Sequence, residues 1–156
     1  MSGVLGTNVV TQIAIVVKDI EATKKKYAEF FGVDVPGHFD SGPHDENSDA
    51  VTLYKGAPNY RAGAKLAFIN IGPNVALELI EPIGGASVWK DVLDEKGEGF
   101  HHIAFVVKDI DESITACENF GMPLVQRSVS PPGSGNYAYL DGTKDLKCII
   151  ELLCGY

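Results

Sequence analysis

The hydrophobic pattern of the chain is clearest near its start, where residues 11–17 alternate between two kinds of side chain. Such a period of two is typical of a β-strand with a different environment on each face. One face carries bulky isoleucine and valine side chains, which predicts burial under an apolar layer. The other face carries Gln12 beside the small Ala14, which leaves room for a ligand.

The same pattern returns later in the chain, from position 12 to position 102. Residues 12–21 read Gln-Ile-Ala-Ile-Val-Val-Lys-Asp-Ile-Glu, and residues 102–111 read His-Ile-Ala-Phe-Val-Val-Lys-Asp-Ile-Asp. A repeat with so long an offset indicates two half-chain modules and not a short solenoid unit. Only the first position changes chemistry, from an amide at Gln12 to an imidazole at His102, and both groups are able to bind a metal.

A helix is predicted after each repeated strand, with Asp19 and Asp109 at the N-cap and Gly32 and Gly121 at the C-terminal end. Further strands are expected at 65–71, 74–80, 137–140 and 147–153, with a loop over 36–48 and a short linking helix within 84–99. The expected fold class is therefore α+β, in which two tandem βαβββ modules, residues 8–83 and 99–154, form a cupped mixed β-sheet with helices packed outside. Residues 1–156 are expected to make one domain.

Composition narrows the range of functions. The chain has 156 residues, 45% of them hydrophobic, and a formal net charge of −8, which argues against a nucleic-acid partner. Three cysteines without a C-x-x-C spacing indicate free thiols in a reducing compartment. The apolar stretch at 9–17 is interrupted and far shorter than the ~20 residues of a membrane span. We therefore expect a cytoplasmic protein that binds neither membrane nor nucleic acid.

Two glutamates stand in the middle of apolar strands, Glu78 within 76–80 and Glu151 within 149–153. A buried carboxylate is costly unless it is paired, protonated or bound to a metal. Taken singly, each residue has an interpretation without a ligand role. Each glutamate would face solvent from its strand, Gln12 would be a polar residue at a strand end, and His102 would belong to a turn. Their equivalent places in the two modules favour a common cause, because an amide, an imidazole and two carboxylates suit one divalent ion such as Zn, Co, Ni or Mn.

Two neighbouring residues are expected to take no direct part. His101 should point away from His102 on a regular strand and at best support it from behind. Glu81, at the end of its strand beside a proline, is expected at the surface.

Three segments carry a family resemblance. They are residues 77–82 (Leu-Glu-Leu-Ile-Glu-Pro), 87–93 (Ser-Val-Trp-Lys-Asp-Val-Leu) and 97–105 (Gly-Glu-Gly-Phe-His-His-Ile-Ala-Phe). With the paired modules, they make the chain similar to the vicinal oxygen chelate superfamily, which includes lactoylglutathione lyase, methylmalonyl-CoA epimerase, extradiol dioxygenases and bleomycin-resistance proteins. The segments look most like methylmalonyl-CoA epimerase. The resemblance implies that the metal ligands are Gln12, Glu78, His102 and Glu151.

The chain departs from the epimerase pattern at three positions. Epimerases usually have histidine at the position of Gln12, and often glutamine or histidine at that of Glu78. The catalytic glutamate of the family falls at Arg61, which cannot act as a base but is suited to binding a substrate carboxylate. The quartet of ligands is instead the one seen in zinc-type lactoylglutathione lyases, the glyoxalase I enzymes.

The resemblance implies an isomerase or lyase that removes a proton next to a carbonyl through a metal-stabilised enediolate, with Glu151 and Glu78 as catalytic carboxylates and Arg61 in substrate binding. A methylmalonyl-CoA epimerase-like activity is expected first, and a glyoxalase I-like activity is the alternative. The substrate would be an acyl-CoA or a glutathione thioester or hemithioacetal, and the protein a homodimer. A non-catalytic small-molecule binder like the bleomycin-resistance proteins is the second alternative. An extradiol dioxygenase is disfavoured, since it normally needs two histidine ligands.

Overall fold

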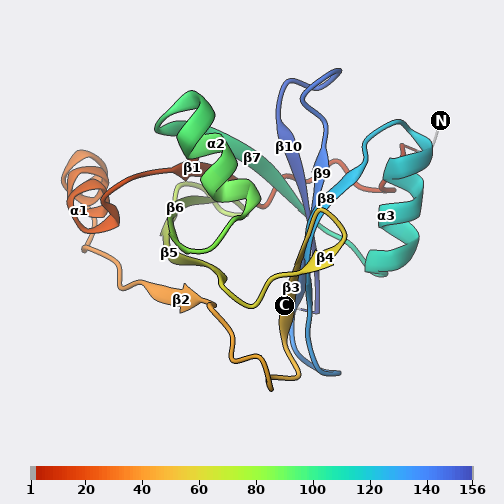
Figure 1. Ribbon diagram of the computed structural model, residues 1–156. Helices are drawn as coiled ribbons and strands as arrows, with labels where there is room; N and C mark the ends of the chain where they lie inside the picture. Colours follow the sequence, from red (N-terminus) through yellow and green to blue (C-terminus); the bar gives the residue numbers. More distant parts are fainter. Residues whose placement is uncertain (1–2, 156) are drawn as a thin grey trace.

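One curled, ten-stranded mixed sheet and three helices make up this computed structural model, which describes residues 3–155 (Figure 1). The elements in chain order are β1 (Gln12–Val16), α1 (Ile20–Phe31), β2 (Phe39–Ser41), β3 (Val51–Tyr54), β4 (Ala57–Pro58), β5 (Ala62–Asn70), β6 (Ala76–Gly84), α2 (Val88–Lys96), β7 (Gly99–Val106), α3 (Ile110–Asn119), β8 (Leu124–Val129), β9 (Asn136–Asp141) and β10 (Ile149–Cys154). The expectation of an α+β fold with a cupped mixed sheet is confirmed.

The first strands of the two halves, β1 and β7, form an antiparallel pair in the middle of the sheet. From this pair the strands continue outward as β6, β5 and β2 on one side, and as β10, β9 and β8 on the other. The hairpin of β3 and β4 belongs to the first half of the chain but is attached to β8 of the second half. The two flanking strands, β6 and β10, run parallel to β1 and β7.

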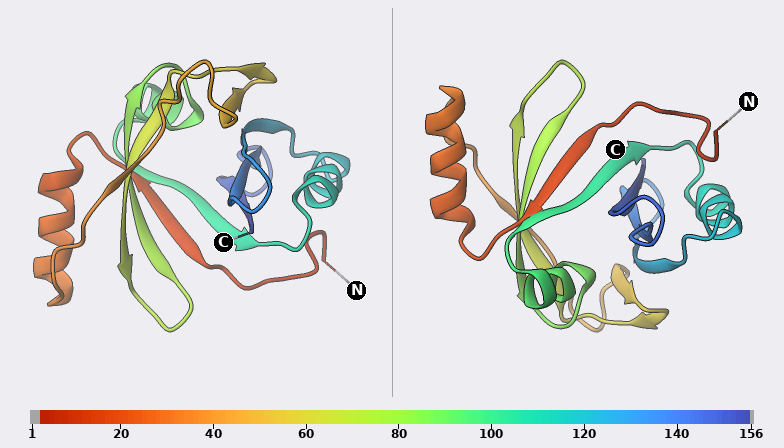
Figure 2. Two further views of the ribbon diagram at one scale, coloured as in Figure 1. Left: turned by 90° about the horizontal axis from the view of Figure 1, so that it is seen from below. Right: turned by 90° about the horizontal axis from the view of Figure 1, so that it is seen from above.

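The outer face of the sheet is covered by α1 on one side and α3 on the other, at opposite ends of the molecule in Figure 2. Under α1 lie side chains such as Ile15, Leu77 and Leu79, and a second apolar cluster lies under α3. Helix α2 differs from the expected outside packing, because its Trp89 packs against Tyr139 and other residues of the inner face. The bulky face predicted for the first strand is therefore the outer one, as the alternation indicated.

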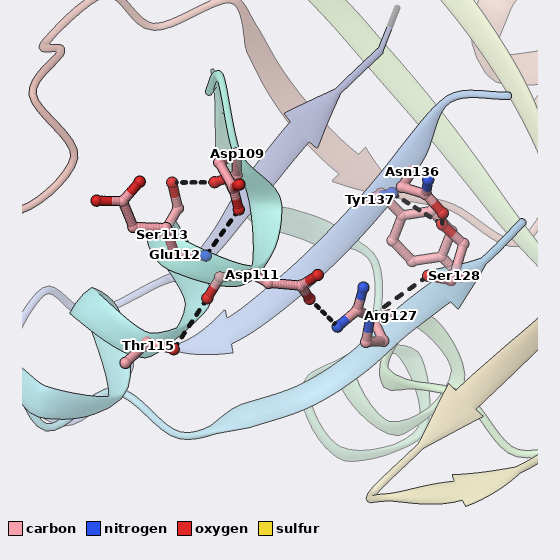
Figure 3. A network of polar contacts seen from close by, with 9 residues as sticks. All are labelled: Asp109, Asp111, Glu112, Ser113, Thr115, Arg127, Ser128, Asn136 and Tyr137. Atoms are coloured by element: carbon pink, nitrogen blue, oxygen red, sulfur yellow. Dashed lines mark hydrogen bonds and ion pairs between the residues drawn. The ribbon is translucent and has the colours of Figure 1, made fainter. Parts of the chain in front are cut away.

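The helix ends follow the predicted signals. The Asp19 side chain accepts a hydrogen bond from Ala22 N at 2.9 Å, and Gly32 ends α1 in the left-handed conformation with φ of 69°. Asp109 caps α3 in the same way, accepting from Glu112 N at 2.9 Å (Figure 3). An ion pair of 2.7 Å between Asp111 and Arg127 then ties the first turn of α3 to β8, as Figure 3 shows.

Two expectations about individual segments need correction. The loop expected over 36–48 contains β2, which pairs with β5 at the edge of the sheet. Glu81 is no surface residue, since its side chain is 17% exposed and lies within β6. It accepts hydrogen bonds from Ile20 N and Lys65 Nζ at 2.8 and 2.7 Å, so it satisfies the first amide group of α1 and pairs with a lysine of β5.

The described helices include none that is both long enough and apolar enough to cross a lipid bilayer.

Candidate metal centre

Strand register places two small alanines at the centre of the inner face. Ala14 on β1 and Ala104 on β7 are fully buried, and each lies between neighbours on two adjacent strands. Residues directly opposite each other share one face of a sheet. The four predicted ligands surround the alanines in this way: Glu78 and His102 stand beside Ala14, and Gln12 and Glu151 stand beside Ala104.

The two glutamates approach the same nitrogen of the histidine. His102 Nε2 lies 2.9 Å from Glu151 Oε2 and 3.2 Å from Glu78 Oε2. One ligand atom from each of the three residues lies within 4.8 Å of the others. The residues are buried, with 0% exposure for His102, 3% for Glu78 and 4% for Glu151. All three come from one chain, so the cluster needs no second copy to form.

These short contacts do not meet hydrogen-bond geometry. Among the buried side-chain atoms without a hydrogen-bond partner in the described residues, four come from the four predicted ligands: Gln12 Oε1, Glu78 Oε2, His102 Nε2 and Glu151 Oε2. A buried polar atom left without a partner costs roughly 1–3 kcal/mol, so such groups are rare in proteins. A divalent cation among them would satisfy all four, and the donor types suit it.

The charges of the cluster act on one another. Burial alone would lower the pKa of His102, but the charges of Glu151 and Glu78 and the contacts with them raise it to about 9. Burial raises the pKa of Glu78, and the nearby charge of Glu151 adds to this increase. Without a metal, His102 is therefore protonated at neutral pH and partly balances the two acids.

The inner face opens into a cavity of about 360 Å³. It is lined by Thr11, Gln12, Phe39, Ser41, Leu66, Phe68, Ala76, Glu78, Trp89, Val106, Tyr137, Tyr139, Glu151 and Leu153. Most of these side chains are aromatic or aliphatic, so a bound molecule would be largely shielded from water beside the two acids. Phe39 and Ser41 belong to β2, and sequence reasoning missed them because a three-residue edge strand carries no periodic signal.

Behind the cluster lies a second layer of buried rings. The Tyr139 hydroxyl accepts a hydrogen bond from Trp89 Nε1 at 3.0 Å, and the Tyr139 ring lies 5.1 Å from the ring of His102. Burial, with the charges of Glu151 and Glu78, raises the pKa of Tyr139 well above its ordinary value, so the phenol stays neutral.

His101 also belongs to this second layer, although a regular strand would turn it away from His102. Its Nδ1 lies 2.9 Å from Nδ1 of His102. Burial lowers the pKa of His101 well below its ordinary value, and the neighbouring His102 lowers it further. The expectation that His101 points away is therefore wrong.

Arg61 is not brought into the cluster. It is exposed, immediately before β5, whereas Phe68 is the residue of β5 that pairs with Glu78. At about 3.3 Å per residue, the distance along the strand from position 61 to position 68 is roughly 23 Å. Arg61 is also not one of the residues that line the cavity, and its role in substrate binding stays a prediction.

The fold and the cluster together define an α+β protein with a candidate mononuclear metal centre on the inner face of a curled sheet. A family model described as the Glyoxalase/Bleomycin resistance protein/Dioxygenase superfamily matches residues 11–139, and the chain belongs to this superfamily. The family resemblance of the sequence is thereby confirmed.

Two curated relatives match over part of the chain. An ethylmalonyl-CoA/methylmalonyl-CoA epimerase from Cereibacter sphaeroides is 31% identical over 99 residues, which cover 63% of this chain and 60% of the relative. The uncharacterized protein YqjC from Bacillus subtilis is 30% identical over 89 residues, which cover 57% of this chain and 63% of the relative. The matched part therefore spans less than two thirds of the length of either relative.

Methylmalonyl-CoA epimerases also occur among the similar solved structures. A variant of the Streptomyces coelicolor enzyme in complex with 2-nitronate-propionyl-CoA superimposes with a TM-score of 0.60, at 20% identity, over 93% of this chain and 95% of that chain. At this level of identity, the likeness shows the fold alone.

Proposed function

We propose that the protein is a metal-dependent enzyme that moves a proton next to a carbonyl group, with an activity like that of methylmalonyl-CoA epimerase. The observation that carries the proposal is the convergence of buried ligand atoms from Glu78, His102 and Glu151, beside a cavity that is also lined by Gln12, whose buried Oε1 has no hydrogen-bond partner among the described residues. The epimerase names of one curated relative and of a similar structure support this choice of reaction.

These four residues would hold one divalent ion such as Zn, Co, Ni or Mn. When bound, the ion supplies positive charge that stabilises the negative charge developing on a carbonyl oxygen, as an enediolate requires. Two carboxylates, a neutral imidazole and an amide oxygen would give the site an overall charge near zero.

The two glutamates are suited to proton transfer. Glu78 on β6 and Glu151 on β10 lie on opposite sides of the central pair of strands. One carboxylate would remove the proton from one face of the substrate, and the other would return it from the opposite face. We assign the essential role in proton transfer to Glu151. The apolar wall of the cavity would keep bulk water from competing for the proton.

Equivalent halves of the chain would explain why Glu78 and Glu151 lie on opposite sides of the central strands, since each glutamate would occupy the same place in its own module. The order β1, α1, β2, β5, β6 in residues 8–83 corresponds to β7, α3, β8, β9, β10 in residues 99–154, with the β3–β4 hairpin as an addition. This correspondence supports a duplicated βαβββ unit in a single domain.

A glyoxalase I-like activity is the second candidate, because the ligand set of one amide, one imidazole and two carboxylates is the one expected for that enzyme. The substrate would then be a glutathione hemithioacetal in place of an acyl-CoA. In both cases we expect a cytoplasmic homodimer.

Solvent-exchange measurements test the proposal. Zinc- or cobalt-loaded protein is incubated in D₂O with methylmalonyl-CoA, and in parallel with the hemithioacetal of methylglyoxal and glutathione. Deuterium entering C2 of methylmalonyl-CoA supports the epimerase-like reaction, and formation of lactoylglutathione supports the second candidate. Stoichiometric metal binding without either reaction would count against both activities, and binding of small molecules without metal would favour a non-catalytic binder.

A further inference from the structure

His101 occupies an irregular position in β7. In the ladder between β1 and β7, Ala14 pairs with His102 and the next residue, Ile15, pairs with Phe100. His101 is therefore an extra residue without a partner on β1, which is the pattern of a β-bulge. Bulges turn a side chain away from the direction that simple alternation gives it, and they are frequent beside active sites.

The bulge brings the two histidine rings into contact. Their Nδ1 atoms are 2.9 Å apart, and the ring planes are inclined by 79° with centroids 5.1 Å apart. At this distance one Nδ1 must donate a proton and the other must accept it, because two bare nitrogens would repel each other.

The surroundings of His102 decide which ring donates. Its Nε2 faces Glu78 and Glu151 and needs a free electron pair to bind a cation. A neutral imidazole carries one proton, so that proton must lie on Nδ1 of His102 and be donated to Nδ1 of His101. His101 must then carry its own proton on Nε2.

The environment of His101 agrees with this arrangement. The backbone of Val88, the first residue of α2, acts to raise the pKa of His101 and so favours a proton on this ring. His101 Nε2 itself is buried and has no hydrogen-bond partner among the described residues. The ring of Tyr139 packs against both histidines, at centroid distances of 5.5 and 5.1 Å, and limits their rotation.

We propose that His101 is a positioning residue, which holds His102 in the Nδ1-protonated form and so presents Nε2 to the metal. The inference rests on the proposed metal site and names the residue that orients its only imidazole ligand. Second-layer partners of this kind typically change metal affinity by 10- to 100-fold when they are removed.

Two substitutions at the same position test the proposal. His101→Leu removes the acceptor and keeps an apolar side chain in a buried place, whereas His101→Gln retains an oxygen that can accept from His102 Nδ1. Zinc affinity is measured by competition with a chromophoric chelator, and ¹⁵N chemical shifts report the protonated nitrogen of His102. His44→Gln, which changes a histidine outside the site, is the control.

We expect His101→Leu to weaken zinc binding by 10- to 100-fold and to mix the two protonation forms of His102. His101→Gln should recover affinity to within a few-fold of the wild type. Equal zinc affinity in the Leu variant and the wild type would overturn the proposal. So would equal losses in both variants without a change in the ¹⁵N shifts, which would indicate a purely structural role.

The wild-type spectrum keeps the test decisive if the Leu variant fails to fold. A wild-type zinc complex in which His102 Nδ1 carries no proton would overturn the proposal by itself. Failure of wild-type protein to bind zinc at all would instead overturn the proposed metal-dependent function, so the two failures are distinguishable.

Discussion

Metal binding at the inner face is expected to displace a proton from His102. The two carboxylates raise the pKa of this histidine from the ordinary 6.5 to about 9, despite its complete burial. At pH 7 only about one molecule in a hundred then has the neutral imidazole that a metal requires, so the apparent metal affinity lies roughly 100-fold, or about 3 kcal/mol, below its limit.

Metal affinity and the stability of the metal-free protein should depend on pH in opposite directions. Apparent metal affinity should rise about tenfold per pH unit between pH 6.5 and 8.5 and level off above 9. The stability of the metal-free protein should fall as the pH rises, because the raised pKa of His102 means that the folded state favours the protonated imidazole. This stabilisation, of about 3 kcal/mol, is fully present below pH 6.5 and is lost as the pH rises through 9.

Calorimetric titration with zinc in buffers of different ionisation enthalpy measures both the affinity and the number of protons released. We expect about one proton per metal ion at pH 7.5 in the wild type and in the control His44→Gln. An affinity that does not change between pH 6.5 and 8.5, with no proton released, would refute the coupling between His102 and the two acids.

Three further substitutions probe the same centre. Glu151→Gln should reduce turnover at least 100-fold, and full turnover with metal still bound would contradict its assignment. Ala104→Leu should fill the space between the ligands, abolish zinc binding and lower the free energy of unfolding by about 1–3 kcal/mol; unchanged zinc affinity would show that the metal lies elsewhere. Trp89→Phe removes the hydrogen bond to Tyr139 and should cost about 1–3 kcal/mol in urea unfolding, whereas an unchanged midpoint would mean that this bond adds nothing.

The central strands could be predicted from the sequence because they carry two independent signals. Alternation with a period of two marks their faces, and the internal repeat shows that Gln12 and His102 hold equivalent places. The apolar residues on both sides of Glu78 and of Glu151 predict the two other strands that carry site residues. Helix ends followed in the same way, since Asp19 and Asp109 have a local capping role that needs no tertiary information.

Other features depend on contacts that local patterns do not encode. The bulge at His101 arises from the register between β1 and β7, so the alternation of residues alone predicted the wrong face for its side chain. The edge strand β2 forms only because β5 offers it a partner. Glu81 was placed at the surface because its partners, the start of α1 and Lys65, are distant in sequence.

Anomalous scattering from a zinc-soaked crystal, recorded at the zinc absorption edge, tests the central claim most directly. The account predicts one strong peak on the inner face, at about 2.0–2.2 Å from one oxygen or nitrogen of each of Gln12, Glu78, His102 and Glu151. An absent peak, or a zinc ion held by other residues while these four side chains bond to one another or to water, would contradict it.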